Sequence, residues 1–210
     1  MERDFDWWWT APGEWVEPPN ERRNGWSGMM RVWADERLYY VKRQRNHMCR
    51  TVRHPLGWPT TSREWQNLHR VRALGLGAPV PVFHATRPTA QGVEAVLVTE
   101  ELAGYRDLAQ FSDLEPEACQ RLAQAVGHML GVLHRHRLQH SSLYDKHIMI
   151  RPEGEGFHPA LIDLEKMRVR LTRRGAAAHD LEQLQRRQKV LDATAWAVLC
   201  RAHTASFNAA

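Results

Sequence analysis

The chain has 210 residues, of which 43% are hydrophobic, a length that suits one domain or two small lobes sharing a core. Its net charge of +5 and pI near 9.4 predict an anionic partner: a nucleotide, a phosphorylated sugar, nucleic acid or the inner face of a membrane. The sequence contains no membrane-spanning run of about eighteen apolar residues and no signal-peptide profile. The three cysteines form neither a zinc pattern nor a disulfide pattern, which favours a protein of the reducing cytoplasm.

The first 24 residues are rich in tryptophan, with Trp7-Trp8-Trp9 and Trp15 close to Pro18-Pro19. Tryptophans this dense near a chain end favour a hydrophobic clamp that docks on the body of the protein. An anchor at a membrane interface is the alternative.

Residues 24–33, 34–37 and 38–44 predict a strand, a turn and a second strand. Gly25 and Gly28 would let backbone amides approach a phosphate, although any tight turn also uses glycine. Lys42 ends the second strand, where a protein kinase keeps the lysine that pairs with phosphates. The alternative is a solvated lysine on an edge strand.

A helix is expected from Thr60, after a loop at residues 54–59, and it ends near Gly75. Its apolar positions recur at three to four residues. Thr61 and Glu64 have the spacing of a capping box, so Glu64 has a purely structural interpretation. In the functional interpretation, Glu64 pairs with Lys42 and orients it.

Residues 82–86 and 95–101 predict two more strands, the second apolar enough to be central. A linker at 102–105 follows, in the position of a kinase hinge, where backbone groups bind adenine. A short helix at 106–111 and a long helix from Glu115 come next. The long helix has an apolar stripe formed by Leu122, Ala125, Val126, Met129, Leu130 and Leu133.

Residues 140–165 predict a polar loop, a strand to Ile150, a turn, and a second strand that delivers Asp163. Protein kinases arrange their catalytic loop and their metal-binding acid in this way. Several histidines precede or enter the loop, but His134 and His136 do not share a helix face, which disfavours a histidine metal site. A basic run at 166–174, a helix from 176 and a last apolar segment at 193–202 complete the chain.

These parts stand in the order found in kinases, and their sequence motifs resemble those of the bacterial lipopolysaccharide core kinase (WaaP-like) family, especially its InaA group. The resemblance covers residues 7–190. The matching segments are 23–28, 38–43, 52–60, 97–100, 147–148, 164–166 and 179–180. It implies an α+β, protein-kinase-like two-lobed fold. Residues 1–102 would form a small antiparallel β lobe with one helix, and residues 103–210 a short, mainly helical lobe.

The resemblance also implies ATP and Mg²⁺ as cofactors. Lys42 would contact the ATP phosphates with Glu64 as its partner, while Asp163 would bind magnesium. Asp180 would brace the catalytic-loop backbone. The remaining implied cofactor-binding residues are Gly25 and Gly28 at the phosphates, and Glu100 and Leu102 at the adenine.

The catalytic loop departs from the family pattern. Ser142 occupies the place of the catalytic aspartate, two residues after His140, and a serine cannot accept a proton as a carboxylate does. His147 stands where other kinases have a metal-binding asparagine. Asp145 is the candidate substitute base, with a loop-capping role as its alternative, and His140 is expected to be a loop brace more than a base.

Three functions follow. One is a kinase that phosphorylates a sugar hydroxyl, with lipopolysaccharide core as a candidate acceptor and peripheral contact with the inner membrane. The second is a pseudokinase that binds a nucleotide or a partner in a stress response, as the InaA resemblance implies. The third, a binder of nucleic acid or membrane that depends on basic charge, lacks any recognised nucleic-acid motif and is disfavoured. Only 47 residues follow Asp163, too few for a platform that binds protein substrates.

Overall fold

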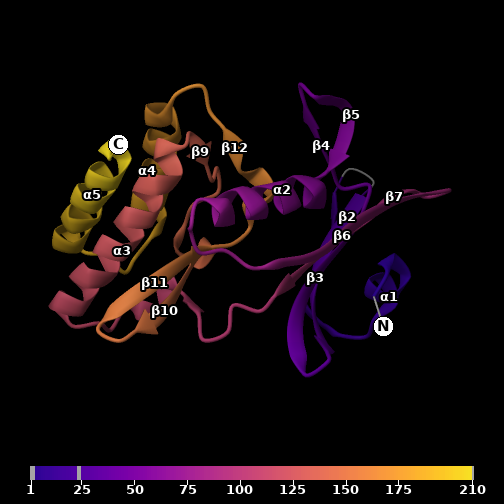
Figure 1. Ribbon diagram of the computed structural model, residues 1–210, viewed down its shortest axis with the longest axis horizontal. Helices are drawn as coiled ribbons and strands as arrows, with labels where there is room; N and C mark the ends of the chain where they lie inside the picture. Colours follow the sequence, from indigo (N-terminus) through magenta and orange to yellow (C-terminus); the bar gives the residue numbers. More distant parts are fainter. Residues whose placement is uncertain (1–2, 23–24, 210) are drawn as a thin grey trace. The chain divides into compact units, whose positions relative to one another are not determined.

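The structure is a computed structural model that describes residues 3–22 and 25–209 (Figure 1). The chain forms two compact units, Met1–His69 with Pro79–Leu102, and Arg70–Ala78 with Ala103–Ala210. Residues 70–78, which the prediction assigned to the first lobe, belong to the second unit. The reason is a backbone hydrogen bond from Leu161 N to Gly77 O (2.9 Å) beside a bridge from Gly77 to Ala160.

The first unit contains a five-stranded antiparallel sheet in the order β1-β2-β3-β7-β6. Its strands are β1 (Glu14–Arg22), β2 (Gly25–Ala34), β3 (Arg37–Arg45), β7 (Gly92–Glu100) and β6 (Pro81–Thr89). The predicted strand-turn-strand at 24–44 is confirmed by β2 and β3. Asp35 and Glu36, both at positive φ, form the tight turn between them. Strand β1 was not predicted. It is an edge strand whose register shifts around Pro18-Pro19, where an amide donor is missing.

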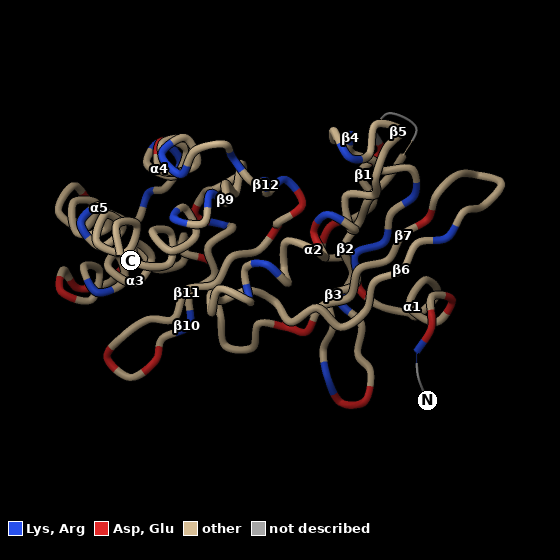
Figure 2. The backbone as a smooth tube through the Cα atoms, turned by 45° about the horizontal axis from the view of Figure 1, so that its top comes forward, with Lys and Arg blue, Asp and Glu red and all other residues tan. Residues whose placement is uncertain are grey.

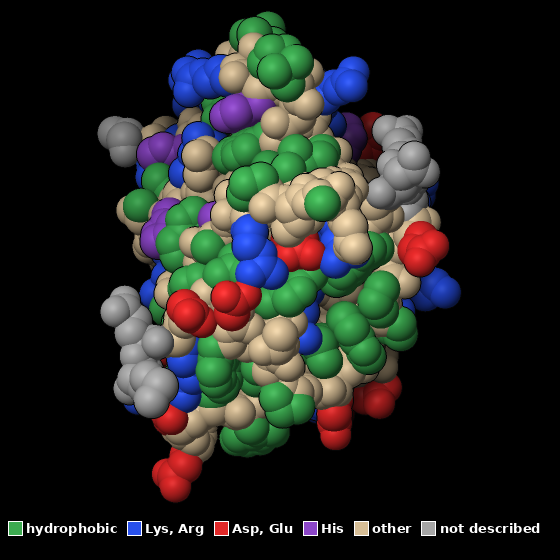
Figure 3. Space-filling view, turned by 90° about the vertical axis from the view of Figure 1, so that its right-hand side faces the viewer, with side chains coloured by type: hydrophobic (Ala, Val, Ile, Leu, Met, Phe, Trp, Pro, Cys, Tyr) green, Lys and Arg blue, Asp and Glu red, His purple; other side chains and the backbone are tan. Residues whose placement is uncertain are grey.

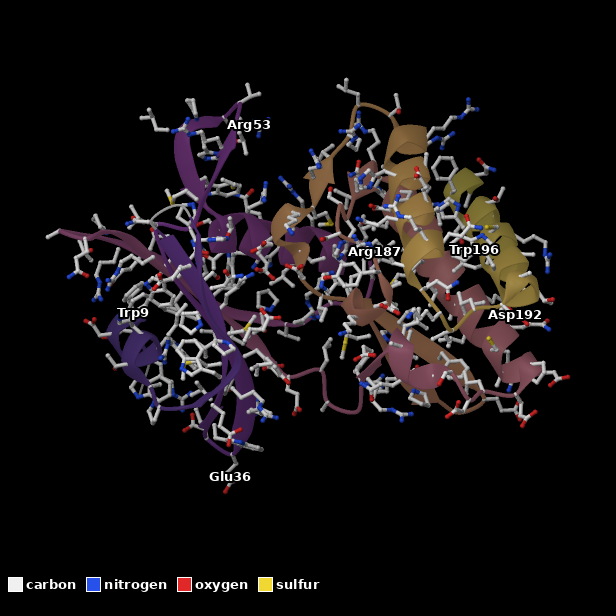
Figure 4. All side chains as sticks on the ribbon, turned by 180° about the vertical axis from the view of Figure 1, so that it is seen from behind. Trp9, Glu36, Arg53, Arg187, Asp192 and Trp196 are labelled. Carbon is white, nitrogen blue, oxygen red and sulfur yellow. The ribbon has the colours of Figure 1, made fainter. Side chains whose placement is uncertain are left out.

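Alternation along β3 sends its side chains to two different faces of the sheet. Tyr39 and Val41 pack beneath α1 (Phe5–Thr10), where Trp8 is 2% exposed and lies edge-on to Tyr39. Trp9, labelled in Figure 4, packs against the same cluster. The tryptophan-rich start is therefore a hydrophobic clamp in this structure, with only Trp7 of the triplet exposed.

Arg43 fastens α1 to the sheet. Its buried guanidinium donates to Trp8 O (2.9 Å), Ala11 O (2.6 Å) and the Met30 sulfur (3.0 Å). Burial lowers the pKa of Arg43 from its ordinary value. The charge stays in place because three acceptors replace the water that it has lost.

The opposite face of β3 carries Lys42 and Gln44, and these meet the start of α2 (Thr60–Ala73). The segment before α2 is not a loop, as predicted, but a two-stranded ribbon of β4 (Met48–Thr51) and β5 (His54–Pro59). The proline and glycine content of this segment hid the strands. Within the part of the chain that the structure describes, they pair only with each other and so tolerate the missing donors.

The second unit packs three helices with a small sheet. Its helices are α3 (Pro116–Arg135), α4 (Arg173–Arg187) and α5 (Ala193–Asn208), and its 3₁₀ turns are η1 (Leu108–Phe111), η2 (Asp145–His147) and η3 (Leu164–Lys166). The predicted hairpin is confirmed as β10 (Ile148–Glu153) with β11 (Gly156–Leu161), and β8 (Arg106–Asp107) pairs with β10. A separate pair joins β9 (Leu138–Gln139) to β12 (Arg168–Val169).

Helices α3 and α5 approach so closely that only glycine fits between them. A Cβ on Gly127 would lie 2.3 Å from Leu199 O, and one on Gly131 would lie 2.5 Å from His203 O. This contact places the end of α3 beside α5 and so positions the histidines described below. Among the helices of the described residues, none combines the length and hydrophobicity that a membrane crossing requires.

Arg43→Met keeps an apolar stem of similar length but removes the donors to Trp8 O and Ala11 O. We expect the free energy of unfolding to fall by about 2–3 kcal/mol, because hydrogen bonds from a buried charged group are worth roughly that much. Urea unfolding followed by tryptophan fluorescence measures it. Arg37→Met, at a side chain 71% exposed, is the control and should change stability by less than about 0.5 kcal/mol. Equal stability of the two variants would contradict this role for Arg43.

Candidate functional site

Lys42 and Glu64 form a buried ion pair in the first unit. Lys42 Nζ lies 2.9 Å from Glu64 Oε2, and the two side chains are 11% and 8% exposed. An edge-strand lysine in solvent, the structural alternative for Lys42, is wrong because β3 lies inside the sheet. A buried ion pair contributes little net stability and is costly to desolvate, so its presence favours a role in binding.

The capping box predicted for Thr61 and Glu64 is not formed, since the buried Thr61 Oγ1 has no hydrogen-bond partner among residues 3–22 and 25–209. The side chain of Gln44 covers the helix start instead. Its Oε1 accepts from Thr60 Oγ1 (2.9 Å) and Thr61 N (3.3 Å), and its Nε2 donates to His47 O (2.9 Å). Glu64 is therefore not needed as a cap. This role of Gln44 was not predicted, although its place two residues after Lys42 puts it on the same face of β3.

Gly25 and Gly28 both lie in β2, where Gly25 is the first residue and pairs with Arg22 of β1. Close packing explains both glycines: a Cβ on Gly25 would lie 2.5 Å from Asn46 O, and one on Gly28 would lie 2.6 Å from the Trp15 ring. Arg23 and Asn24, part of the resembling segment 23–28, lie outside the described residues. The phosphate-binding role of these glycines stays a prediction.

The expected adenine-binding residues end the first unit. Glu100 is the last residue of β7 and its amide donates to Val80 O (2.9 Å). Its carboxylate lies 3.7 Å from Arg37 at the surface. Leu102 is half-buried and is the last residue of the unit.

In the second unit, the Asp180 carboxylate holds the catalytic-type loop. Asp180 is fully buried in α4 and accepts from His140 N (2.5 Å), Ser141 N (3.0 Å) and His134 Nε2 (3.3 Å). Burial raises the pKa of Asp180, but the hydrogen bonds from His134 and the two amides outweigh burial and hold the pKa below its ordinary value. This geometry is the loop brace that the resemblance implies.

A second histidine extends this network. His203 on α5 places Nε2 2.9 Å from His134 Nδ1, and both rings are buried. When neutral His134 donates through Nε2 to Asp180, its Nδ1 accepts from His203 Nε2. His203 lies 69 residues from His134, and no local pattern marks it, so the sequence analysis did not find it.

His140 is fully buried and cannot reach a substrate from this position. Its Nε2 donates to Ile162 O (2.9 Å), next to Asp163, while its buried Nδ1 has no hydrogen-bond partner among the described residues. Burial is the main cause that lowers the pKa of His140, to about 4, so the ring is neutral near pH 7. His140 thus joins the loop to the strand end that carries Asp163.

His147 and Asp163 lie together, with Nε2 of the histidine 3.5 Å from Oδ2 of the aspartate. His147 Nδ1 is 2.7 Å from Ser142 O and must carry the proton that it donates to that carbonyl. In the neutral ring, Nε2 is then an electron-pair donor that faces a carboxylate oxygen. Two such donors repel each other unless a proton or a cation lies between them, so the pair suits either an imidazolium–carboxylate ion pair or a bound cation.

The described residues contain no cluster of three histidine, cysteine, aspartate or glutamate side chains with metal-binding geometry. Glu165, considered as an additional carboxylate, lies in η3 directly beyond Asp163 and is half-buried. A metal held by Asp163 and His147 would therefore need ligands other than a third histidine, cysteine, aspartate or glutamate side chain of the described residues. Phosphate oxygens and water are the usual ones for a nucleotide-bound metal.

The loop between His140 and His147 holds the two candidate catalytic residues. Ser142 is half-buried, and its carbonyl is the group that orients His147. Asp145 begins η2, where its Oδ1 accepts from Lys146 N (2.9 Å), the geometry of a loop cap. A role for Asp145 as a base stays a prediction.

Left-handed backbone conformations mark both sides of this site. Ser141 has φ 71° and Asp163 has φ 55°, an uncommon conformation for residues other than glycine. The Asp180 carboxylate stabilises Ser141 through its amide. Such strain gathers where surrounding contacts fix a backbone for function.

The fold and both residue groups define a protein-kinase-like protein. A solved structure of WaaP in complex with acyl carrier protein superposes with a TM-score of 0.74 at 24% identity, covering 98% of this chain and 88% of the other. The chain belongs to the lipopolysaccharide kinase (Kdo/WaaP) family, whose family model matches residues 6–203.

Two named relatives agree with this assignment. Protein InaA of Escherichia coli K12 is 34% identical over 199 residues, which cover 92% of each chain. The lipopolysaccharide core heptose(I) kinase WaaP of Pseudomonas aeruginosa is 26% identical over 168 residues, which cover 67% of this chain and 59% of the relative. The predicted family resemblance is thus confirmed.

The buried histidines make stability depend on pH. The pKa values of His140 and His203 are both lowered to about 4, whereas unfolded histidine titrates near 6.5. The unfolded chain therefore binds up to two more protons between about pH 4 and 6.5. We expect the free energy of unfolding to fall by up to about 2.7 kcal/mol per pH unit as the solution is acidified through this window.

Urea unfolding at several pH values between 4 and 7 measures this slope. His203→Gln keeps a donor for His134 but cannot titrate, so the slope should decrease by about 1.4 kcal/mol per pH unit. His136→Gln, at the exposed end of α3, is the control. An unchanged slope in His203→Gln would show that His203 is not buried in its neutral form.

Proposed function

We propose that the protein is an ATP-dependent phosphotransferase that acts on a sugar hydroxyl, with lipopolysaccharide core as the acceptor. The observation that carries this proposal is the facing pair of His147 Nε2 and Asp163 Oδ2, 3.5 Å apart. Membership of a lipopolysaccharide kinase family supports the same reaction. In this proposal the protein works in the cytoplasm, where ATP is available, with peripheral contact to the inner membrane.

The residues of the first unit would bind the nucleotide. Lys42 Nζ, held by Glu64, would contact the phosphates, and the Gly25 and Gly28 backbone would lie along them. The backbone of Glu100 and Leu102 would bind the adenine. The ion pair fixes the lysine before ATP arrives, so less conformational entropy is lost on binding.

The residues of the second unit would hold the metal and the acceptor. A divalent metal bound by Asp163 and His147 supplies charge neutralisation at the phosphates. The basic segment 166–174 follows directly, and Arg168 Nε donates to Ser141 Oγ (3.1 Å) beside Ser142. These arginines suit a phosphorylated or acidic sugar acceptor.

Ser142 makes the reaction slower without forbidding it. Phosphoryl transfer depends chiefly on positioning and charge neutralisation, and a general base contributes roughly 10²–10⁴-fold. Asp145 is the proposed substitute base. Acceptor deprotonation would need its side chain to leave the loop-cap bond to Lys146 N.

A pseudokinase that binds nucleotide or a partner in a stress response is the second candidate. Ser142 in place of the aspartate favours it, as does the similarity to InaA over 92% of the chain. The solved WaaP structure contains acyl carrier protein, which makes such a carrier a candidate partner here. Turnover of ATP with an acceptor separates the two functions.

Nucleotide binding is tested by calorimetry with MgATP on wild type, Lys42→Ala and Asp163→Ala. We expect wild type to bind with a Kd on the order of micromolar and each variant to lose at least about tenfold, because each loses a charge that faces phosphate or metal. Lys146→Ala, an exposed lysine in the loop, is the control. Absence of binding by folded wild type would contradict the kinase and the nucleotide-binding pseudokinase alike.

The metal preference is tested separately with His147→Asn. Mn²⁺, a transition metal, accepts an imidazole nitrogen more readily than Mg²⁺ does, although both bind oxygen ligands. We expect wild type to bind MnATP more tightly than MgATP and His147→Asn to lose that preference. Electron paramagnetic resonance of bound Mn²⁺ should show coupling to a histidine nitrogen in wild type and in His136→Gln only. Retained coupling in His147→Asn would show that His147 is not the ligand.

A further inference from the structure

The β4–β5 ribbon exposes apolar side chains that a folded protein ordinarily covers. Val52 at its tip is 101% exposed, Leu56 is 96% exposed, and Met48 is 39% exposed. The ribbon pairs with no other strand of the described residues. Figure 4 shows Arg53 at its outer end, away from the five-stranded sheet. Neighbouring exposed apolar residues of this kind mark interaction surfaces.

The charged residues of the ribbon are all basic. Between residues 48 and 59 the chain carries Arg50 and Arg53, both exposed, and no aspartate or glutamate. In Figure 3 the upper end of the molecule, where the ribbon lies, shows hydrophobic side chains between basic ones. Apolar side chains beside arginines, without acids, match a surface that presents both acyl chains and phosphates.

The ribbon has an ordered local structure. His54 stacks on Trp58 with ring centroids 4.5 Å apart, the His54 amide donates to Thr51 Oγ1 (3.1 Å), and Cys49 Sγ donates to Trp58 O (3.3 Å). These contacts fix the two strands on either side of the turn. The tip therefore presents its exposed residues in one arrangement, with little ordering left to be done on binding.

We propose that the β4–β5 ribbon docks on an anionic phospholipid membrane. Val52 and Leu56 enter the boundary between headgroups and acyl chains, while Arg50 and Arg53 contact lipid phosphates. Trp58, half-buried at the base, lies nearer the headgroups. This names the surface for the peripheral membrane contact of the proposed function. It does not depend on phosphoryl transfer.

The ribbon lies in the chain between the two elements that form the buried ion pair. It connects β3, which carries Lys42, to α2, which carries Glu64, and its start is tied to α2 by Thr60 N donating to His47 O (3.1 Å). Membrane docking at the tip thus acts on the two elements that form the ion pair. A membrane-bound acceptor would bind the protein while the ribbon is docked on the membrane.

Flotation of the full chain with vesicles tests the proposal. The vesicles are phosphatidylglycerol with phosphatidylethanolamine, and phosphatidylcholine alone. Wild type should bind the anionic vesicles, bind phosphatidylcholine at least tenfold more weakly, and lose affinity as salt rises. The variants Val52→Ser/Leu56→Ser and Arg50→Gln/Arg53→Gln should each lose at least tenfold.

Matched controls separate the ribbon from exposure and charge elsewhere. Trp33→Ser removes an apolar side chain 70% exposed on β2, near the acidic β2–β3 turn that Figure 2 shows in red. Arg186→Gln/Arg201→Gln removes two exposed charges from α4 and α5. Both controls should bind anionic vesicles as wild type does.

Brominated lipids locate the contact, because they quench only tryptophans at the membrane. Trp58→Phe should reduce the quenching, and Trp33→Phe should not. Failure to bind anionic vesicles, or binding that the ribbon variants leave unchanged, would overturn the proposal. Ribbon variants that lose binding to a protein partner but keep vesicle binding would also overturn the proposal. MgATP binding by the ribbon variants should equal that of wild type, which keeps this test separate from that of the nucleotide site.

Discussion

The Asp180 carboxylate is the constraint on which the site of the second unit depends. It is buried in α4 and binds the amides of His140 and Ser141, which fixes the left-handed turn at the start of the catalytic-type loop. His140 then reaches Ile162 O and so ties the loop to the strand end before Asp163. The buried Asp180 carboxylate thus fixes the position of the loop and strand end that carry His147 and Asp163, although it does not itself contact substrate.

Much of the fold follows from local patterns. The aromatic and β-branched residues of 38–44 predict β3, and the spacing of Leu68 and Val71 predicts the buried face of α2. The strands β1, β4 and β5 were missed for one shared reason. Each lies outside the centre of the large sheet. In β1 and β5 such a position tolerates proline, which lacks an amide donor, and β4 has only four residues in which to show a pattern.

The candidate site likewise contains residues that the sequence predicts and residues that it does not. Lys42, Glu64, His147 and Asp163 stand at the ends of predicted elements, so kinase order alone predicts their pairing, and the structure brings each pair together. Gln44 and His203 could not be found, because their roles come from partners 16 and 69 residues away. Tertiary packing, unlike a cap or a turn, leaves no signal at a fixed spacing. The local spacing at Thr61 predicted a capping box that does not form, because Gln44, distant in sequence, supplies the acceptor at the helix start.

Phosphoryl transfer itself tests the central claim most directly. ATP labelled in its γ-phosphate is incubated with lipopolysaccharide stripped of core phosphate, and label in the sugar is measured for wild type, Asp163→Asn and Ser142→Asp. We expect slow transfer by wild type, none by Asp163→Asn, and faster transfer by Ser142→Asp, which regains a carboxylate in the place of the base. Nucleotide binding without transfer by wild type or Ser142→Asp would contradict the kinase and favour the pseudokinase.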